Sequence, residues 1–302
     1  MIRFGPSGND ILFYAQGNKT SVQAPAWLAA MGLSAFEVNF GRGIKMGDKM
    51  AQELGAEARK HNIAVSIHAP YYINLASPDP AYVKKSYGYI KSCLDVARKI
   101  NSPLQGEGVA PPKGGDGVGP SRLVVHIGSQ CDLPREVAIE NCKRNIKWVA
   151  DELVKNGFTD FLLGIETMGR PKAIGNVREV CEICRDAGPY IVPVLDFGHI
   201  NAIERGSLQK NPARFREVID YCIETLGREK MERVHIHFSA IEFTQNGECR
   251  HTTLDDPKWN FPFEPLAQVI KEYKLQPTII CESEDIMAQD AKQLLDIWQK
   301  TV

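Results

Sequence analysis

Histidine and carboxylate side chains stand at or near the ends of six predicted β-strands in this 302-residue chain. An ionisable side chain at the end of a buried strand is unfavourable unless a partner compensates for its charge. Imidazole and carboxylate groups are common ligands of divalent metals, so a metal is the partner that this pattern favours. The residues are His68, His126, Glu166, Asp196 with His199 after it, His235 and Glu282. Each has a simpler explanation when taken alone, such as Asp196 capping a following helix.

The size of this ligand set predicts more than one metal ion. One catalytic metal takes about three protein ligands and a water, so we expect two or three ions. Metals a few Å apart can hold both the attacking and the leaving oxygen of a phosphodiester. Glu166 lies in the middle of the set and is the predicted bridging, catalytic carboxylate. The nitrogen-rich set favours Zn²⁺, with Mn²⁺ and Fe²⁺ as alternatives.

Eight predicted strand–helix units position these side chains. The predicted strands cover residues 2–4, 35–40, 64–68, 122–126, 161–166, 191–196, 233–238 and 278–282, and the helices 24–31, 46–61, 79–100, 135–155, 177–187, 212–226, 265–273 and 288–299. Strict alternation predicts a parallel sheet with crossover helices. Eight units in one chain of this length predict a closed (β/α)₈ TIM barrel, whose active site lies at the carboxyl ends of the strands. We expect a single domain over residues 1–302, with a Gly/Pro-rich surface excursion at 101–121.

Composition narrows the class of protein. The formal net charge is −1, so no broad basic surface attracts nucleic acid and any anionic substrate must be bound by local groups. The N-terminal stretch lacks the apolar core of a signal peptide, and no apolar run is long enough to span a bilayer. The eight cysteines are scattered, as is typical of reduced thiols. These features predict a cytoplasmic monomer with no membrane partner.

The sequence resembles endonuclease IV, the AP endonuclease family 2 of multi-zinc TIM-barrel enzymes. The resemblance covers most of the chain and is carried by the segments SIHAPYYINL, VVHIGS, IETM, LDFGH, VHIHFS, ECRHTTL and ICES. It implies hydrolysis of duplex DNA on the 5′ side of abasic or damaged sites. It also implies three zinc sites: His68, His126 and Glu166 at the first, Glu166, Asp196, His235 and Glu282 at the second, and His199 with His251 at the third.

One position departs from the family pattern. The family has an aspartate two residues before the ligand that His251 matches, whereas this chain has Cys249 there, preceded by Glu248. A Cys249 thiolate, Glu248 or the nearby His237 are alternative third-site ligands. Because side chains two residues apart on a strand share a face, His237 points to the same side as His235. A packed core histidine is an equally good interpretation of His237.

Substrate contacts follow from the same resemblance. An enzyme that acts on an abasic nucleotide must take it out of the base stack and fill the gap. Tyr71 and Tyr72 match the family residues that do so, and tyrosine rings stack on bases. Arg42 matches a DNA-contacting arginine. A packing pair of tyrosines and a solvated arginine are the structural alternatives.

Two other classes of protein share some of these features. A sugar isomerase or epimerase of the xylose isomerase-like TIM-barrel superfamily also places His, Glu and Asp at strand ends. It needs fewer metal ligands, so the number of bound ions discriminates between the two. The second alternative is a non-catalytic protein that binds metal or nucleic acid. An activity assay would distinguish it from an enzyme.

Overall fold

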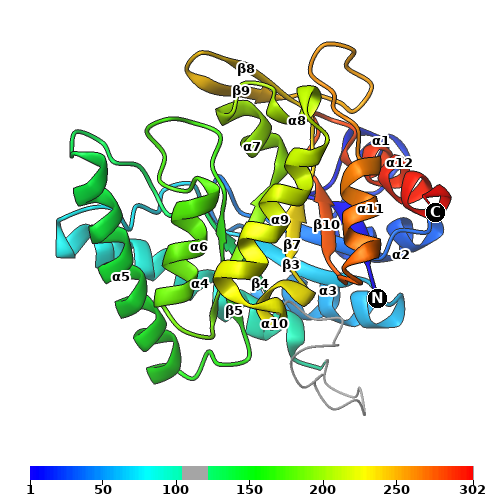
Figure 1. Cartoon of the computed structure of the whole chain (residues 1–302). Helices are drawn as coiled ribbons and strands as arrows, with labels where there is room; N and C mark the ends of the chain where they lie inside the picture. The colour runs from blue at the N-terminus through cyan, green and yellow to red at the C-terminus, as the bar shows by residue number, and fades with distance from the viewer. Residues whose placement is uncertain (104–121, 302) are drawn as a thin grey trace.

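A computed structural model describes residues 1–103 and 122–301 of the chain (Figure 1). Most of the predicted excursion at 101–121 therefore lies outside the described residues. Eight parallel strands form one sheet in the order β1-β10-β7-β6-β5-β4-β3-β2. A bridge between Ser7 and Glu37, with the Gly8 amide donating to the Glu37 carbonyl at 2.8 Å, joins the two edge strands. The prediction of a single (β/α)₈ barrel is confirmed.

The barrel strands agree with the predicted ones to within a few residues. They are β1 (Arg3–Pro6), β2 (Ala35–Asn39), β3 (Ala64–His68), β4 (Arg122–Val125), β5 (Leu162–Glu166), β6 (Ile191–Asp196), β7 (His235–His237) and β10 (Thr278–Cys281). The long loop expected after β7 instead contains an antiparallel hairpin. Its strands are β8 (Ile241–Thr244) and β9 (Gly247–His251), and it lies at the top of Figure 1 beside α7 and α8.

The outer layer consists of the predicted helices and some short additional ones. The helices are α1 (Ile11–Ala15), η1 (Ser21–Gln23), α2 (Ala24–Ala30), α3 (Asp48–Lys60), α4 (Pro80–Asn101), α5 (Arg135–Lys155), α6 (Val177–Asp186), α7 (Phe197–Ile203), α8 (Ser207–Lys210), α9 (Ala213–Leu226), α10 (Arg228–Glu232), α11 (Glu264–Glu272) and α12 (Met287–Lys300). In the described residues, no helix is both long and apolar enough to cross a membrane.

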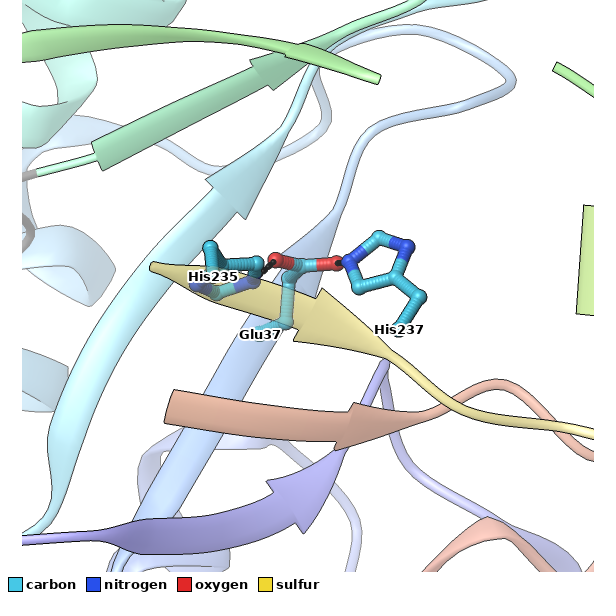
Figure 2. A group of neighbouring side chains, drawn as sticks. All are labelled: Glu37, His235 and His237. Carbon is cyan, nitrogen blue, oxygen red and sulfur yellow. Dashed lines mark hydrogen bonds and ion pairs between the residues drawn. The ribbon is translucent and has the colours of Figure 1, made fainter. Parts of the chain in front are cut away.

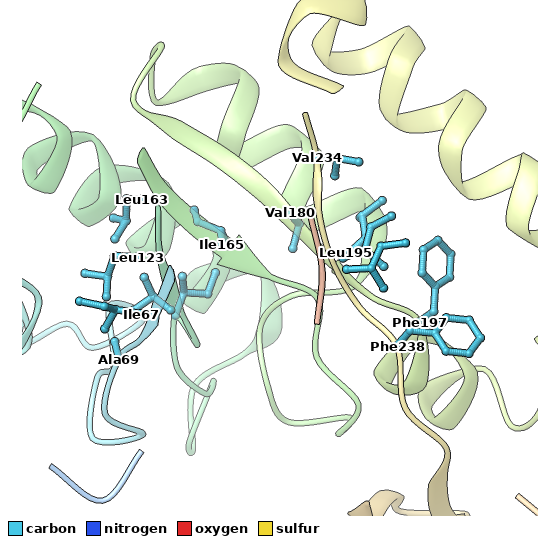
Figure 3. Packing of buried hydrophobic residues seen from close by; sticks show 14 of the residues in the cluster. Ile67, Ala69, Leu123, Leu163, Ile165, Val180, Leu195, Phe197, Val234 and Phe238 are labelled. Atoms are coloured by element: carbon cyan, nitrogen blue, oxygen red, sulfur yellow. The ribbon is translucent and has the colours of Figure 1, made fainter. Parts of the chain in front are cut away.

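Alternation along the strands divides apolar from ionisable side chains. Successive residues of a strand point to opposite faces. Ile67 and Leu195 belong to the buried cluster packed between the strands and helices, as Figure 3 shows. Their neighbours His68 and Asp196 are equally buried, at 1% and 0% exposure. One face of these strands therefore packs in the apolar core, and the other face carries polar side chains into the barrel.

Candidate metal centre

Four groups of side chains inside the barrel and beside the hairpin that follows β7 have donor atoms close enough to share a cation. Within each group, these atoms lie within 4.8 Å of one another. The groups are His68, His126 and Glu166; Glu166, Asp196, His237 and Glu282; His199, Glu248 and His251; and Glu37, His235 and His237. Glu166 and His237 each belong to two groups, and His199 of the remaining group lies 3.2 Å from Glu166, so the ligands form one continuous centre.

The first group joins the ends of β3, β4 and β5. Nε2 of His68 lies 3.1 Å and Nε2 of His126 lies 3.0 Å from Oε2 of Glu166. Nδ1 of His68 lies 2.8 Å from the Ala69 carbonyl, which can only accept, so the lone pair of the neutral ring is on Nε2. Burial by itself lowers the pKa of His68, but the hydrogen bond and charge of Glu166 outweigh it and raise the pKa to about 9. A cation here would replace a proton that the carboxylate attracts.

The second group has buried polar atoms with no hydrogen-bond partner: Oε1 of Glu166, Oδ2 of Asp196 and Nδ1 of His237. Nδ1 of His237 lies 3.3 Å from Glu166, 3.8 Å from Asp196 and 3.4 Å from Glu282. Burial and the charge of Glu166 raise the pKa of Asp196, because buried carboxylates repel one another. Unpartnered buried atoms are costly, and a divalent cation would satisfy all of them at once. The residues therefore fit a metal.

Asp196 combines the two roles that its position suggested. Its Oδ1 accepts from the backbone amide of His199 at 2.7 Å and so caps α7. Its Oδ2 is left without a hydrogen-bond partner and faces the second group. The sequence did not predict α7, yet this helix holds His199 three residues beyond the strand end. Capping a helix and binding a metal are therefore compatible functions of one carboxylate.

The structure groups His237, and not His235, with Glu166, Asp196 and Glu282, whereas the prediction from the sequence assigned His235 to this group. Nε2 of His235 lies 3.0 Å from Glu37, and His237 is the histidine that reaches Glu166, Asp196 and Glu282. Both rings point into the barrel, but two residues along a strand correspond to about 7 Å of height. His237 is the last residue of β7, so the rule that active sites lie at strand ends could have selected it. Glu37 was also missed, although a lone carboxylate in the apolar stretch AFEVNF was a signal.

Glu248, and not Cys249, supplies the carboxylate of the third group. Oε2 of Glu248 lies 3.4 Å from Nε2 of His199, whose Nδ1 lies 2.8 Å from the Thr167 carbonyl. The Cys249 side chain is exposed, and its sulfur lies 3.9 Å from the hydroxyl of Thr244. The ladder pairs Phe243 with Glu248 but Glu242 with Arg250, which leaves Cys249 as an unpaired bulge residue. A bulge re-aims the side chains beside it, so Glu248 and His251 face the same group although they are three residues apart.

We expect Glu248→Gln to remove one tightly bound ion and Cys249→Ser to remove none. A site with two histidines lacks the negative charge that offsets the desolvation of a cation. Elemental analysis after mild chelation should therefore find about one ion fewer in Glu248→Gln than in the wild type. Cys249→Ser is the matched control, one residue away on the same strand. Loss of an ion in Cys249→Ser alone would show that the thiolate is the ligand.

Two of the three side chains expected to contact substrate, Tyr71 and Tyr72, line one cavity beside the centre. This cavity has a volume of 770 Å³ and is lined by Tyr71, Tyr72, His126, His199, His251 and Glu282 among others. Tyr71 is 53% exposed and Tyr72 47% exposed, and the Tyr71 ring stacks on His126 with centroids 5.1 Å apart. The exposed Arg42 follows Gly41, whose carbonyl accepts from the Tyr71 amide at 3.2 Å. Its loop therefore adjoins the tyrosine loop.

Two cationic side chains that were not predicted from the sequence also line this cavity. Arg170 and Lys172 follow β5 in the loop that leads to α6. Arg170 lies 3.6 Å from Glu248, which links this loop to the third ligand group. These two cationic side chains place positive charge on the wall of the cavity, close to a centre that is rich in carboxylates.

Comparison with known proteins agrees with this architecture. The chain is 27% identical over 300 residues to an uncharacterized protein of Methanocaldococcus jannaschii, with 99% of this chain and 98% of the other covered. Among solved structures, endonuclease IV from Thermus thermophilus superposes with a TM-score of 0.67 at 18% identity, covering 99% and 98% of the two chains. D-psicose 3-epimerase from Clostridium cellulolyticum superposes with a TM-score of 0.68 at 14% identity, covering 99% of both.

These two structures are similar to this chain to the same degree, and at such identities they show the fold alone. The family model described as xylose isomerase-like TIM barrel matches residues 25–301, which is most of the sequence. The chain belongs to the xylose isomerase-like TIM barrel family.

Proposed function

We propose that this protein is a metal-dependent phosphodiesterase that cuts DNA on the 5′ side of abasic sites. The observation that carries the proposal is the convergence of three ligand groups on Glu166, His199 and their neighbours. One ion cannot use so many donors, since a catalytic metal takes about three protein ligands. Phosphodiester hydrolysis is the reaction class that benefits from several adjacent cations, because the attacking oxygen and the leaving oxygen both carry negative charge during the reaction.

When bound, the metals would supply positive charge to the phosphate and lower the pKa of an attacking water. The protein would contribute the bridging position of Glu166. One of its oxygens faces His68 and His126, while the other lies 3.3 Å from His237 and 3.2 Å from His199. A carboxylate whose two oxygens face different ligand groups can neutralise two cations and fix their separation. Zn²⁺ suits the histidine-rich set, and Mn²⁺ or Fe²⁺ would fit the same donors.

The cavity surface suits an extruded nucleotide. Half-exposed Tyr71 and Tyr72 present ring faces on which bases can stack, and Tyr71 packs directly on His126 of the first group. Arg170 and Lys172 at the same mouth, and Arg42 beside the tyrosine loop, would contact backbone phosphates. Recognition would thus rest on a few local contacts, which agrees with the net charge of −1.

The second candidate is a one-metal sugar isomerase or epimerase. Glu166, Asp196, His237 and Glu282 by themselves form a complete site for one ion. Glu166 and Glu282 could then act as acid and base, and epimerases are among the structural neighbours with this fold. The additional groups with His68, His126, Glu248 and His251 would have no function in that reaction, and we therefore favour the hydrolase.

The decisive experiment uses metal-loaded protein and a DNA duplex with a single tetrahydrofuran analogue of an abasic site, labelled at either end. This analogue cannot undergo β-elimination, so only hydrolysis cleaves it. We expect a cut on the 5′ side that leaves a 3′-hydroxyl and that disappears after prolonged chelation. No cleavage by a sample with two or three ions per chain, or cleavage by the stripped protein, would refute the proposal. One ion per chain together with ketose epimerisation would establish the alternative.

A further inference from the structure

Glu37 is a fully buried carboxylate beneath the metal centre, in the middle of β2. Figure 2 shows it between two histidines of β7, with one oxygen toward each ring. Oε2 lies 3.0 Å from Nε2 of His235, and Oε1 lies 3.1 Å from Nε2 of His237. A buried charge is unfavourable unless its surroundings compensate for it, so this arrangement requires a function or a full set of donors.

Two hydroxyl groups complete the surroundings of this carboxylate. Oγ of Ser66 donates to Oε2 at 2.8 Å, and Oγ of Ser7 donates to Oε1 at 3.3 Å. Burial opposes ionisation of Glu37, but the neighbouring His237 and His235 hold its pKa well below the usual value. Each oxygen therefore has two polar neighbours. Three of these four contacts are hydrogen bonds, whereas Nε2 of His237 approaches Oε1 without hydrogen-bond geometry. The carboxylate is therefore largely compensated, which leaves little reason for a further cation at this level.

His237 is the link between Glu37 and the metal centre. Its Nε2 faces Glu37, whereas its Nδ1 lies 3.3 Å from Glu166 and 3.4 Å from Glu282. A neutral imidazole has one N–H and one lone pair. An ionised carboxylate with no free donor can only accept, so Glu37 favours the tautomer with hydrogen on Nε2. The lone pair is then on Nδ1 and points to the second ligand group.

We propose that Glu37 is a positioning residue that sets the tautomer and ring orientation of His237 for metal binding. The inference rests on the metal centre of the proposed function, but not on its substrate. His235 would hold the other oxygen of the carboxylate as a neutral donor and bind no metal itself. Carboxylates that accept from a metal-bound histidine typically contribute 10- to 100-fold in metal affinity, so roughly this loss is expected without Glu37.

The test compares the wild type with Glu37→Gln and with Glu179→Gln. Glu179 is a matched control because it is also a buried carboxylate, 6% exposed, but it pairs with Arg135 and belongs to none of the four ligand groups. Zinc affinity is measured by competition with a chromophoric chelator, and ions per chain by elemental analysis at saturating zinc. We expect Glu37→Gln to bind as many ions as the wild type, one of them about 10- to 100-fold more weakly. The visible spectrum of the Co²⁺-loaded protein should change in Glu37→Gln and not in Glu179→Gln.

The possible outcomes separate this inference from the proposed function. A wild type that binds no metal refutes the metal centre itself. Unchanged affinity and an unchanged Co²⁺ spectrum in a folded Glu37→Gln variant refute the positioning role. Loss of a whole ion at saturating zinc shows instead that Glu37 is a ligand. Should Glu37→Gln not fold, Glu37→Asp keeps the charge but withdraws the carboxylate from His237, and unchanged zinc affinity in that variant counts against the proposal.

Discussion

Replacing Glu166 with glutamine is expected to lower the rate of DNA cleavage by on the order of 100-fold or more. The side chain is fully buried, and its two oxygens face different ligand groups. A neutral amide keeps the shape of the side chain but not the charge, and its nitrogen would turn a donor toward one group. The side chain could then no longer neutralise cations at both groups. The apolar layer outside the barrel is unchanged, so the protein should still fold.

The measurement is single-turnover cleavage of the abasic-site duplex, with circular dichroism as a check of folding. Asp290→Asn is a matched control, because Asp290 is 2% exposed, accepts from the Leu254 amide and belongs to none of the ligand groups. We expect the control to cleave at the wild-type rate. Near-normal cleavage by a folded Glu166→Gln variant would show that the reaction does not depend on the shared carboxylate.

Removal of the metals is expected to lower the melting temperature by roughly 10 °C at neutral pH. The centre buries Glu166, Asp196 and several histidine nitrogens, and five of these carboxylate and histidine atoms have no hydrogen-bond partner. A ligand that binds only the folded state at a thousand times its dissociation constant stabilises that state by about 4 kcal/mol. Each kcal/mol corresponds to a few degrees for a domain of this size class, which gives the expected shift.

Thermal unfolding of chelator-treated protein, before and after addition of a small excess of zinc, provides the measurement. The melting temperature should return to its original value with zinc and remain low with Mg²⁺, which prefers oxygen ligands. This result requires no substrate, so it tests the metal centre separately from the reaction. Identical melting temperatures with and without zinc would contradict a metal-stabilised centre.

Much of the architecture was predictable because each barrel strand and helix is specified locally. The run Ile191–Asp196 is apolar up to its last residue, and the chain does form β6 there. The helix predicted over residues 135–155 coincides with α5. His68, Glu166 and Asp196 are the last residues of their strands in the structure as well. Parallel strands in a barrel end at the same rim, so local patterns were sufficient to bring these three together.

The remaining choices depend on atoms that are distant in sequence. Which histidine of β7 reaches Glu166 depends on the register of β7 against β6 and β10, where His235 pairs with Val194 and Thr278. Glu248 replaces Cys249 because a bulge in the β8–β9 ladder shifts the alternation of side chains by one residue. Neither register nor bulge is encoded in the spacing of the residues concerned.

Glu37 shows the same limit most clearly. In the sequence it is one charged residue in an apolar strand, almost 200 positions away from its histidine partners. Only closure of the barrel brings β2 opposite β7 and surrounds the carboxylate with Ser7, Ser66, His235 and His237. The sequence by itself therefore determined which strands carry ionisable side chains into the barrel. The tertiary structure decided their height and their neighbours, because those depend on how separate strands are staggered across a closed sheet.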